Sequence, residues 1–394
     1  MAIEKGQLLR ADIVKQLYYK NPLSLTELSK LTHKSLPLVT KVVNSLIAEG
    51  YIKEQGLAPS TGGRRASLFL LNPNMQKYIV AVAMDQFTTR TVIYDLARNF
   101  VSPVSTLELS IPADNDAVDE LISFIDRNIK ASGIDSGKLL GIGIGIPGFI
   151  DVENGTDHSH LKTKDGSHLG KYLSKKLGLP VFMDNDSSLI ALAEMQFGAA
   201  AGKRDVMVAN IGWGTGLGMI INGQLYRGSS GYAGEFSHIP LSNTDNLCSC
   251  GKRGCLEVET SLLVMTKKAK AEIEKGAATS MAQSFKDNKR NPGELFLEAA
   301  RNHDPLAVSI LSDAAFLIGK GLATLIHIMN PERIVLSGRG AVAGKILLPP
   351  VQQAVNEFCI PRIADKTTIV ISELAADAEL LAAASLVIAH STFE

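Results

Sequence analysis

The sequence predicts an α/β protein with a small winged helix-turn-helix domain at its N-terminus and a larger, two-lobed α/β body. Three observations lead to this prediction. Residues 1–71 show helical periodicity followed by two strand-like runs, and from Lys77 onward strands alternate with helices. Two strand–turn–strand segments, Val80–Leu96 and Val206–Leu225, each precede strand–helix units, which indicates two similar lobes. At 394 residues the chain also exceeds what one hydrophobic core usually supports.

The charge of the chain is unevenly distributed although its net value is zero. Residues 1–75 hold ten Lys and Arg against five Asp and Glu (+5), which leaves 30 against 35 (−5) for the remainder. A basic segment on an acidic body indicates either a nucleic-acid-binding domain or a merely solvated basic face. No apolar run approaches the ~20 residues that cross a bilayer, and the N-terminus lacks an apolar signal core. We therefore expect a cytoplasmic protein without membrane contact.

Local patterns predict three short helices in the N-terminal segment. Ser24 and Glu27 resemble a capping box at the start of the second helix, and Ser35 can cap the third, which Gly50 ends. Two short helices with a tight connection make a helix-turn-helix. The apolar stripes of the first and third helices consist of Ile13, Val14, Leu17, Val39, Val42, Val43 and Leu46.

The two strand-like runs that follow, 51–55 and 65–71, enclose a Gly-rich segment and predict a hairpin wing with a doubly basic tip. Polar side chains of the third helix would face the major groove of double-stranded DNA, and the wing arginines could reach phosphates or a minor groove. A helical protein–protein module would share this core pattern, but charge, wing and polar face together favour DNA. The candidate DNA-binding residues are Lys34, Thr40, Lys41, Asn44, Arg64 and Arg65.

A turn-rich segment, 72–76, marks the junction between this domain and the body. The predicted domains are the DNA-binding domain 1–71, the linker 72–76, and the body 77–394 with lobes at roughly 77–200 and 201–394. Within the body, the patterns predict an apolar strand at 139–150, an amphipathic helix at 169–178, a strand that runs into a helix at 180–198, and a strand within 330–341.

A cluster of Cys and His residues is the strongest single motif. Cys248, Cys250 and Cys255 fall within eight residues, and His238 precedes Cys248 by ten. Three thiolates and an imidazole suit a closed tetrahedral Zn²⁺ site, which would be structural because no ligand position stays open. A disulfide is the alternative, but a cytoplasmic chain and an odd number of clustered cysteines argue against it.

Two further groups of polar residues are candidate ligand contacts. Asn185 and Asp186 lie at the carboxyl end of a strand, where α/β folds bind ligands. Asp186 could act as a general base or accept hydrogen bonds from a polyol. The equal alternative for the pair is a helix N-cap, a role that Asp186 or Ser187 could also fill. Glu235 and Glu257 flank the metal loop, and with His238 they suit a ligand rich in hydroxyl groups; plain surface glutamates are the default alternative.

These motifs together resemble those of the ROK family of repressors, open reading frames and kinases, across nearly the whole chain. The N-terminal domain and its wing resemble the repressor branch, which includes N-acetylglucosamine-, xylose- and glucose-responsive repressors. The resemblance implies an actin-like sugar-kinase fold, a structural zinc, and sugar binding by Asn185, Asp186, Glu235, His238 and Glu257. Asp186 stands where kinases of the family keep their catalytic base. The resemblance rests on CSCGKRGCLE with the upstream His238, IPGFID, DNDSSLIALAE, GWGTGLGMIINGQL and LATLIHIMNPERIVLSG.

The chain departs from the kinase pattern in the turn after the first strand of the body. Family kinases have Asp, any residue, Gly, Gly, Thr; here Asp85 and Thr89 remain, but Phe87 and Thr88 replace both glycines. A Phe side chain takes the space of phosphate groups, and a β-branched Thr resists the positive φ that Gly allows. We therefore expect no catalytic residue, no ATP binding and no kinase activity. Ser237 also stands where the family commonly has Gly.

The resulting expectation is a sugar-responsive, DNA-binding transcriptional regulator. Its expected partners are an inverted-repeat operator and further copies of the chain in a homodimer or homotetramer. A sugar or sugar phosphate would bind in the cleft between the lobes. A sugar kinase that gained a DNA-binding domain is one alternative. A regulator controlled by a protein partner, with a vestigial sugar cleft, is another.

Overall fold

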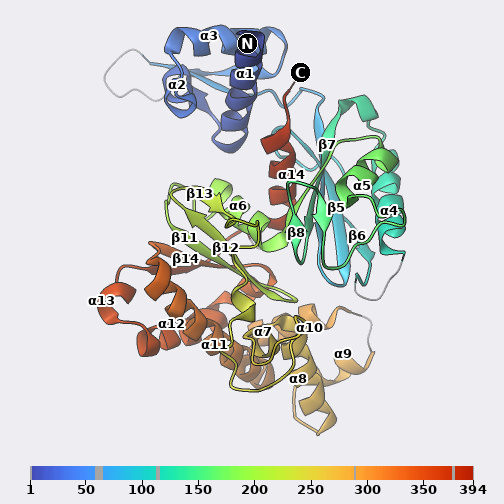
Figure 1. Cartoon of the computed structure of the whole chain (residues 1–394), viewed down its shortest axis with the longest axis vertical. Helices are drawn as coiled ribbons and strands as arrows, with labels where there is room; N and C mark the ends of the chain where they lie inside the picture. Colours follow the sequence, from blue (N-terminus) through green and yellow to red (C-terminus); the bar gives the residue numbers. More distant parts are fainter. Residues whose placement is uncertain (1, 58–64, 112–115, 288–289, 375–377, 394) are drawn as a thin grey trace. The chain divides into compact units, whose positions relative to one another are not determined.

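The structure, a computed structural model, describes residues 2–57, 65–111, 116–287, 290–374 and 378–393, with side chains from Gln7 onward. The chain divides into two compact units, residues 1–184 with 380–394 and residues 185–379. Each unit contains one five-stranded sheet, and the first also contains a three-stranded sheet near the N-terminus (Figure 1).

The N-terminal domain has the element order of a winged helix-turn-helix. Its three-stranded sheet has the order β1-β3-β2, and both strand pairs are antiparallel. The predicted capping box is present: the Glu27 amide donates to Ser24 Oγ at 3.3 Å, and the Ser24 amide donates to Glu27 Oε2 at 2.8 Å. The elements are α1 (Ala2–Tyr19), β1 (Leu23–Ser24), α2 (Leu25–Thr32), α3 (Leu36–Ala48), β2 (Ile52–Leu57) and β3 (Ser67–Leu71).

The core of this domain follows the predicted apolar stripes, with two differences. Val42 is only partly buried, because it lies beside the buried face of α3 rather than on it. Ser35 holds the N-cap position of α3, but its side chain accepts no capping hydrogen bond. The fully buried members of these stripes are Ile13, Val14, Leu17, Val39, Val43 and Leu46, and Leu28 of α2 is buried as well.

The first unit contains a mixed sheet of order β10-β7-β4-β5-β6. The predicted hairpin is present as the antiparallel pair β4–β5, and β7 pairs with β4 in parallel. The last helix of the chain, α14, packs on this sheet. A Cβ added to Gly143 of β7 would lie 1.9 Å from the Ala383 carbonyl oxygen, so the backbone of α14 lies directly on the strand. The elements are β4 (Tyr78–Met84), β5 (Thr88–Asp95), β6 (Ser105–Glu108), α4 (Ala117–Ala131), η1 (Ser136–Lys138), β7 (Leu139–Ile146), β8 (Ile150–Asp151), β9 (Thr156–Asp157), α5 (Leu169–Leu177), β10 (Val181–Asn185) and α14 (Ala378–His390).

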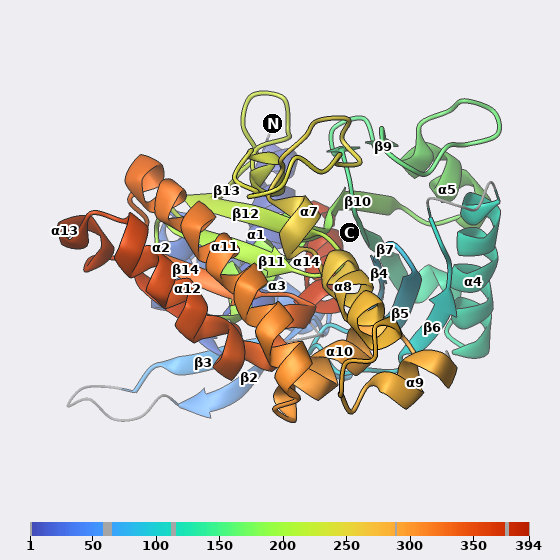
Figure 2. The ribbon, with the colours of Figure 1, turned by 90° about the horizontal axis from the view of Figure 1, so that it is seen from below.

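The second unit contains a sheet of order β13-β12-β11-β14-β15, in which β11 is central and buried along its whole length. Helices α11 and α12 lie side by side in this unit (Figure 2). The elements are α6 (Asp186–Phe197), β11 (Val206–Ile211), β12 (Thr215–Ile221), β13 (Gln224–Tyr226), η2 (Phe236–His238), α7 (Glu257–Thr260), α8 (Leu262–Glu274), α9 (Ala282–Asp287), α10 (Pro292–Arg301), α11 (Pro305–Met329), β14 (Arg333–Ser337), η3 (Arg339–Ala343), α12 (Gly344–Phe358), α13 (Pro361–Ala364) and β15 (Thr368–Ile371).

The compact units differ in two places from the lobes predicted at 77–200 and 201–394. Helix α6 belongs to the second unit because it packs on β11 and β12, and the chain from Leu380 onward belongs to the first. The predicted domain limits themselves stay a prediction.

Helix α11 is the one helix among the described residues that is long and apolar enough to cross a membrane. Most of its apolar stretch is buried within the structure, and it packs against α8, α10 and α12. Asp313 and Lys320 interrupt its apolar sequence, which is why the sequence alone contains no membrane-length apolar run. This pattern is that of a core helix.

Candidate functional site

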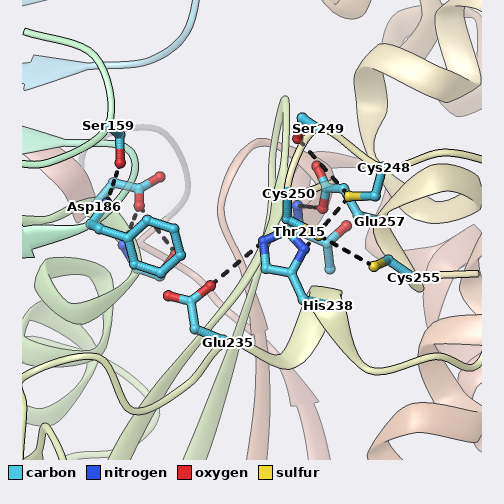
Figure 3. Close-up of polar contacts among 12 residues, drawn as sticks. Ser159, Asp186, Thr215, Glu235, His238, Cys248, Ser249, Cys250, Cys255 and Glu257 are labelled. Atoms are coloured by element: carbon cyan, nitrogen blue, oxygen red, sulfur yellow. Dashed lines mark hydrogen bonds and ion pairs between the residues drawn. The ribbon is translucent and has the colours of Figure 1, made fainter. Parts of the chain in front are cut away.

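The four predicted metal ligands meet in one cluster. Their ligand atoms all lie within 4.8 Å of one another, and Figure 3 shows His238 beside the three cysteines. Nδ1 of His238 lies 3.6 Å from Sγ of Cys248, and Sγ of Cys250 lies 3.6 Å from Sγ of Cys255. A tetrahedral zinc site with bonds of about 2.0–2.3 Å has edges of roughly 3.5–3.8 Å, so the spacing fits a metal. The sulfur separations exclude a disulfide, and all four cysteines are free.

The loop that forms this cluster turns tightly on glycine. Gly251 and Gly254 have φ values of +81° and +73°, a region that favours residues without a Cβ. The amide of Cys248 donates to the Lys252 carbonyl at 2.8 Å, which closes the turn that carries Cys250. Cys248 and Cys255 are buried while Cys250 is exposed, so the cluster sits at the surface of the second unit.

His238 connects the metal cluster to a carboxylate. Its Nδ1 faces Cys248, and its Nε2 lies 3.6 Å from Oε2 of Glu235 on the opposite side of the ring (Figure 3). Burial lowers the pKa of His238, which favours the neutral imidazole that binds metals. With Nδ1 used as a ligand, the ring proton resides on Nε2, which becomes a hydrogen-bond donor beside Glu235.

Glu257 follows the last cysteine of the cluster by two residues and reaches the glycine-rich turn between β11 and β12. Its Oε2 accepts a hydrogen bond from the Thr215 amide at 2.9 Å. Desolvation by burial raises the pKa of Glu257 to about 7, although the Thr215 amide opposes the shift; the charges of Asp186 and Glu235 add to it. Asp186 and Glu235 therefore both lie within electrostatic reach of Glu257 in the second unit.

Asn185 and Asp186 lie at the start of α6, and their side chains make different contacts. The Asn185 side chain caps the helix, because its Oδ1 accepts from the amides of Ser187 and Ser188 at 3.0 and 3.1 Å. The helix N-cap that the sequence analysis offered as the alternative for this pair is present, and Asn185 forms it rather than Asp186 or Ser187. The Asp186 carboxylate accepts at Oδ1 from the Ser187 amide at 2.7 Å and at Oδ2 from Nδ2 of Asn210 at 3.3 Å. The sequence analysis did not single out Asn210, although a lone Asn in the apolar run of β11 is a recognisable signal.

In the turn after β4, a side chain of the turn itself accepts the hydrogen bonds of the backbone amides. Oδ1 of Asp85 accepts hydrogen bonds from the amides of Phe87 and Thr88, both at 2.7 Å, and Oδ2 accepts from the Thr88 hydroxyl at 2.6 Å. A phosphate cradle needs such amides directed at the ligand, and here a carboxylate takes them. No residue of this turn is among the described residues with positive φ, in agreement with the loss of both glycines.

Comparisons with known proteins identify the family of the chain. The sequence model of the ROK family matches residues 93–390, which is well over half of the chain. The chain belongs to the ROK family. This ROK protein is 29% identical over 352 residues to the xylose repressor of Caldicellulosiruptor bescii, covering 88% of this chain and 86% of the relative.

Two solved structures resemble this ROK protein over different shares of its length. A ROK family transcriptional regulator, described as a homologue of the Escherichia coli MLC protein, is 25% identical with a TM-score of 0.76, covering 98% of this chain and 96% of its own. A ROK family glucokinase from Streptomyces griseus, in complex with glucose and AMPPNP, is 26% identical with a TM-score of 0.66. The glucokinase match covers 98% of that enzyme but only 78% of this chain. The predicted fold class and family are therefore confirmed.

The ROK protein presents most of its candidate DNA-binding side chains to solvent. Lys34, Lys41 and Asn44 are exposed, and so is Arg65 at the base of the wing. Thr40 is half-buried, and its hydroxyl donates to the Leu36 carbonyl at 2.8 Å within α3. Arg64 lies outside the described residues.

Proposed function

We propose that this ROK protein is a transcriptional regulator that binds double-stranded DNA and responds to a sugar or sugar phosphate. The observation that carries the proposal is that the Asp85 carboxylate accepts hydrogen bonds from the amides of Phe87 and Thr88. The chain also matches a ROK regulator over 98% of its length. This bonding supports a body that keeps a sugar site and has lost its phosphate cradle. The sugar then acts as a signal, and the protein works in the cytoplasm beside its DNA.

The proposed sugar site comprises Asn185, Asp186, Glu235, His238 and Glu257. Carboxylate oxygens accept hydrogen bonds from hydroxyl groups, and Nε2 of His238 supplies a donor beside them. Such alternation of acceptors and donors is what a polyol requires.

We further propose that His238, Cys248, Cys250 and Cys255 hold one Zn²⁺, which would cross-link the loop without taking part in any reaction. The 3.6 Å separations support this fit. His238 is itself a proposed ligand, and Glu257 follows the ligand Cys255 by two residues. The ion would therefore also hold these sugar-binding groups in place.

DNA would be contacted by Lys34, Thr40, Lys41 and Asn44 in the major groove and by Arg64 and Arg65 from the wing. One small domain makes few contacts, so we propose that the protein binds as a homodimer or homotetramer to an inverted repeat. The hydroxyl of Thr40 already donates within α3, so only its acceptor capacity remains for a base or phosphate.

A thermal-shift series tests the proposal. The protein would be heated with D-xylose, D-glucose, N-acetyl-D-glucosamine and their phosphorylated forms, and separately with ATP and Mg²⁺. We expect at least one sugar to raise Tm, since a ligand at 100 times its Kd contributes about 2.7 kcal/mol, and we expect no shift with ATP. Stabilisation by a sugar also argues against the alternative of a vestigial cleft controlled by a protein partner.

The kinase alternative is favoured by one feature, Asp186 at the position of the kinase base, and it has a direct test. Purified protein would be incubated with ATP, Mg²⁺ and each sugar, and ADP release would be followed. Sugar-dependent turnover on the order of 1 s⁻¹ or faster would replace the regulator proposal with a kinase.

A further inference from the structure

Strand β11 carries one polar side chain in an otherwise apolar, fully buried run. The strand reads Val-Met-Val-Ala-Asn-Ile, and Asn210 is only 5% exposed. A buried amide is costly unless hydrogen bonds satisfy it, so a polar residue at this position needs a reason. Because this side chain is almost fully buried, it does not serve to contact solvent.

Two glycines make room for Asn210 and for the helix turn above it. Asn210 pairs with Gly216 on β12 and with Ser337 on β14. A Cβ on Gly216 would lie 2.0 Å from Oγ of Ser187, and a Cβ on Gly338 would lie 2.2 Å from Oδ1 of Asn210. The space at Gly216 allows the first turn of α6 to approach β12 closely, and the space at Gly338 accommodates the Asn210 amide.

The amide of Asn210 points at that first turn. Its Nδ2 donates to Oδ2 of Asp186 at 3.3 Å and to Oγ of Ser187 at 3.0 Å. The other oxygen of Asp186 accepts from the Ser187 amide at 2.7 Å. The two carboxylate oxygens are thus tied to the sheet and to the helix, which restricts rotation of the carboxylate about its Cβ–Cγ bond.

We propose that Asn210 is a positioning residue that holds the Asp186 carboxylate in the orientation in which it accepts a sugar hydroxyl. The inference rests on the proposed sugar site. A neutral amide orients the carboxylate without the opposite charge that a Lys or Arg would bring, so Asp186 stays a strong acceptor. Asn210 itself does not touch the sugar and acts only through Asp186.

A double-mutant cycle tests the inference on the full-length protein. Affinities for D-xylose, D-glucose, N-acetyl-D-glucosamine and its 6-phosphate would be measured by calorimetry, up to millimolar sugar, for wild type, Asn210→Ala, Asp186→Asn and the double variant. We expect Asn210→Ala to weaken binding roughly tenfold in the wild-type background and less than about twofold beside Asp186→Asn. Equal losses in both backgrounds, or none in either, would overturn the inference.

Ser337→Ala is the matched control. Ser337 occupies the same register position on the neighbouring strand and is also buried, but its hydroxyl bonds Glu194 at 3.0 Å rather than Asp186. We expect this variant to lose stability without losing sugar affinity, and an equal loss of affinity would mark the Asn210 effect as structural. Emission of Trp213, the single tryptophan, checks that the nearby turn stays folded. If Asn210→Ala does not fold, Asn210→Leu, which keeps a similar side-chain volume and removes the donor, replaces it in the cycle.

Sugar binding by the wild-type protein distinguishes a failure of the role proposed for Asn210 from a failure of the proposed function. Wild-type binding to a sugar that Asn210→Ala leaves unchanged would overturn only the role of Asn210. Absence of wild-type binding to all four sugars would overturn the proposed function and this inference together.

Discussion

Arg10 of α1 donates a hydrogen bond from Nε to the backbone carbonyl of Phe393, 383 residues further along the chain, at 2.7 Å. The same guanidinium pairs with Glu49 at the end of α3 and lies 4.9 Å from the centre of the Tyr51 ring. The Phe393 ring, almost fully buried, meets Tyr51 edge to face at 6.5 Å. Phe393, which follows α14, is therefore part of the packing around Arg10 and Tyr51 of the N-terminal domain.

This packing predicts that Phe393→Ala loosens the N-terminal domain. The loss of unfolding free energy should lie at the low end of the roughly 3–5 kcal/mol typical for buried Phe, because residues beyond the last helix can relax. Phe100→Ala is the control, since Phe100 is 49% exposed in the same unit. Denaturant unfolding and hydrogen exchange of α1 measure both variants, and equal behaviour of the two would contradict this role of Phe393.

The metal site predicts a specific loss in Cys250→Ala. We expect the purified wild-type protein to contain one equivalent of zinc by elemental analysis and the variant to contain almost none. Sugar affinity should fall with the metal, because the loop also carries Glu235 and Glu257. Cys359→Ala removes a buried cysteine outside the cluster and should keep the metal. Stoichiometric zinc in Cys250→Ala would refute the ligand assignment.

The exposed cations of the N-terminal domain predict a change in the salt dependence of DNA binding. Removing one cation that neutralises a phosphate reduces the steepness of log K against log salt by about 0.9, so Lys41→Ala with Arg65→Ala should flatten it by roughly 1–2. Lys175→Ala, an exposed lysine on α5 of the body, is the control and should leave the slope unchanged. Fluorescence anisotropy at several salt concentrations measures the slopes; a double variant with the wild-type slope would exclude these two residues as phosphate ligands.

Much of the fold was predictable because its signals are local. The capping box of Ser24 and Glu27 spans four residues, and the hairpin β4–β5 is visible as two apolar runs around one turn. The metal cluster was predictable for the same reason, since its ligands lie between His238 and Cys255.

Features that depend on distant parts of the chain were not predictable. Nothing in the sequence of α14 indicates that it packs on Gly143 of β7, or that Phe393 reaches Arg10. The choice of Asn185 as the cap of α6 depends on how the strand before it enters the helix. Asn210 was missed because its importance lies in a neighbour on another element, Asp186.

The most direct test of the central claim is the DNA affinity of the wild-type protein and Asp186→Asn, each with and without the sugar that stabilises the wild type best. The DNA would be a duplex that the protein itself selects from a random pool, and affinity would be read by fluorescence anisotropy. We predict that the sugar changes wild-type affinity by roughly 5–150-fold, the range for coupling of about 1–3 kcal/mol. Asp186→Asn should bind DNA like the sugar-free wild type and show no response. Wild-type affinity that no sugar changes, or a full response in Asp186→Asn, would contradict the account.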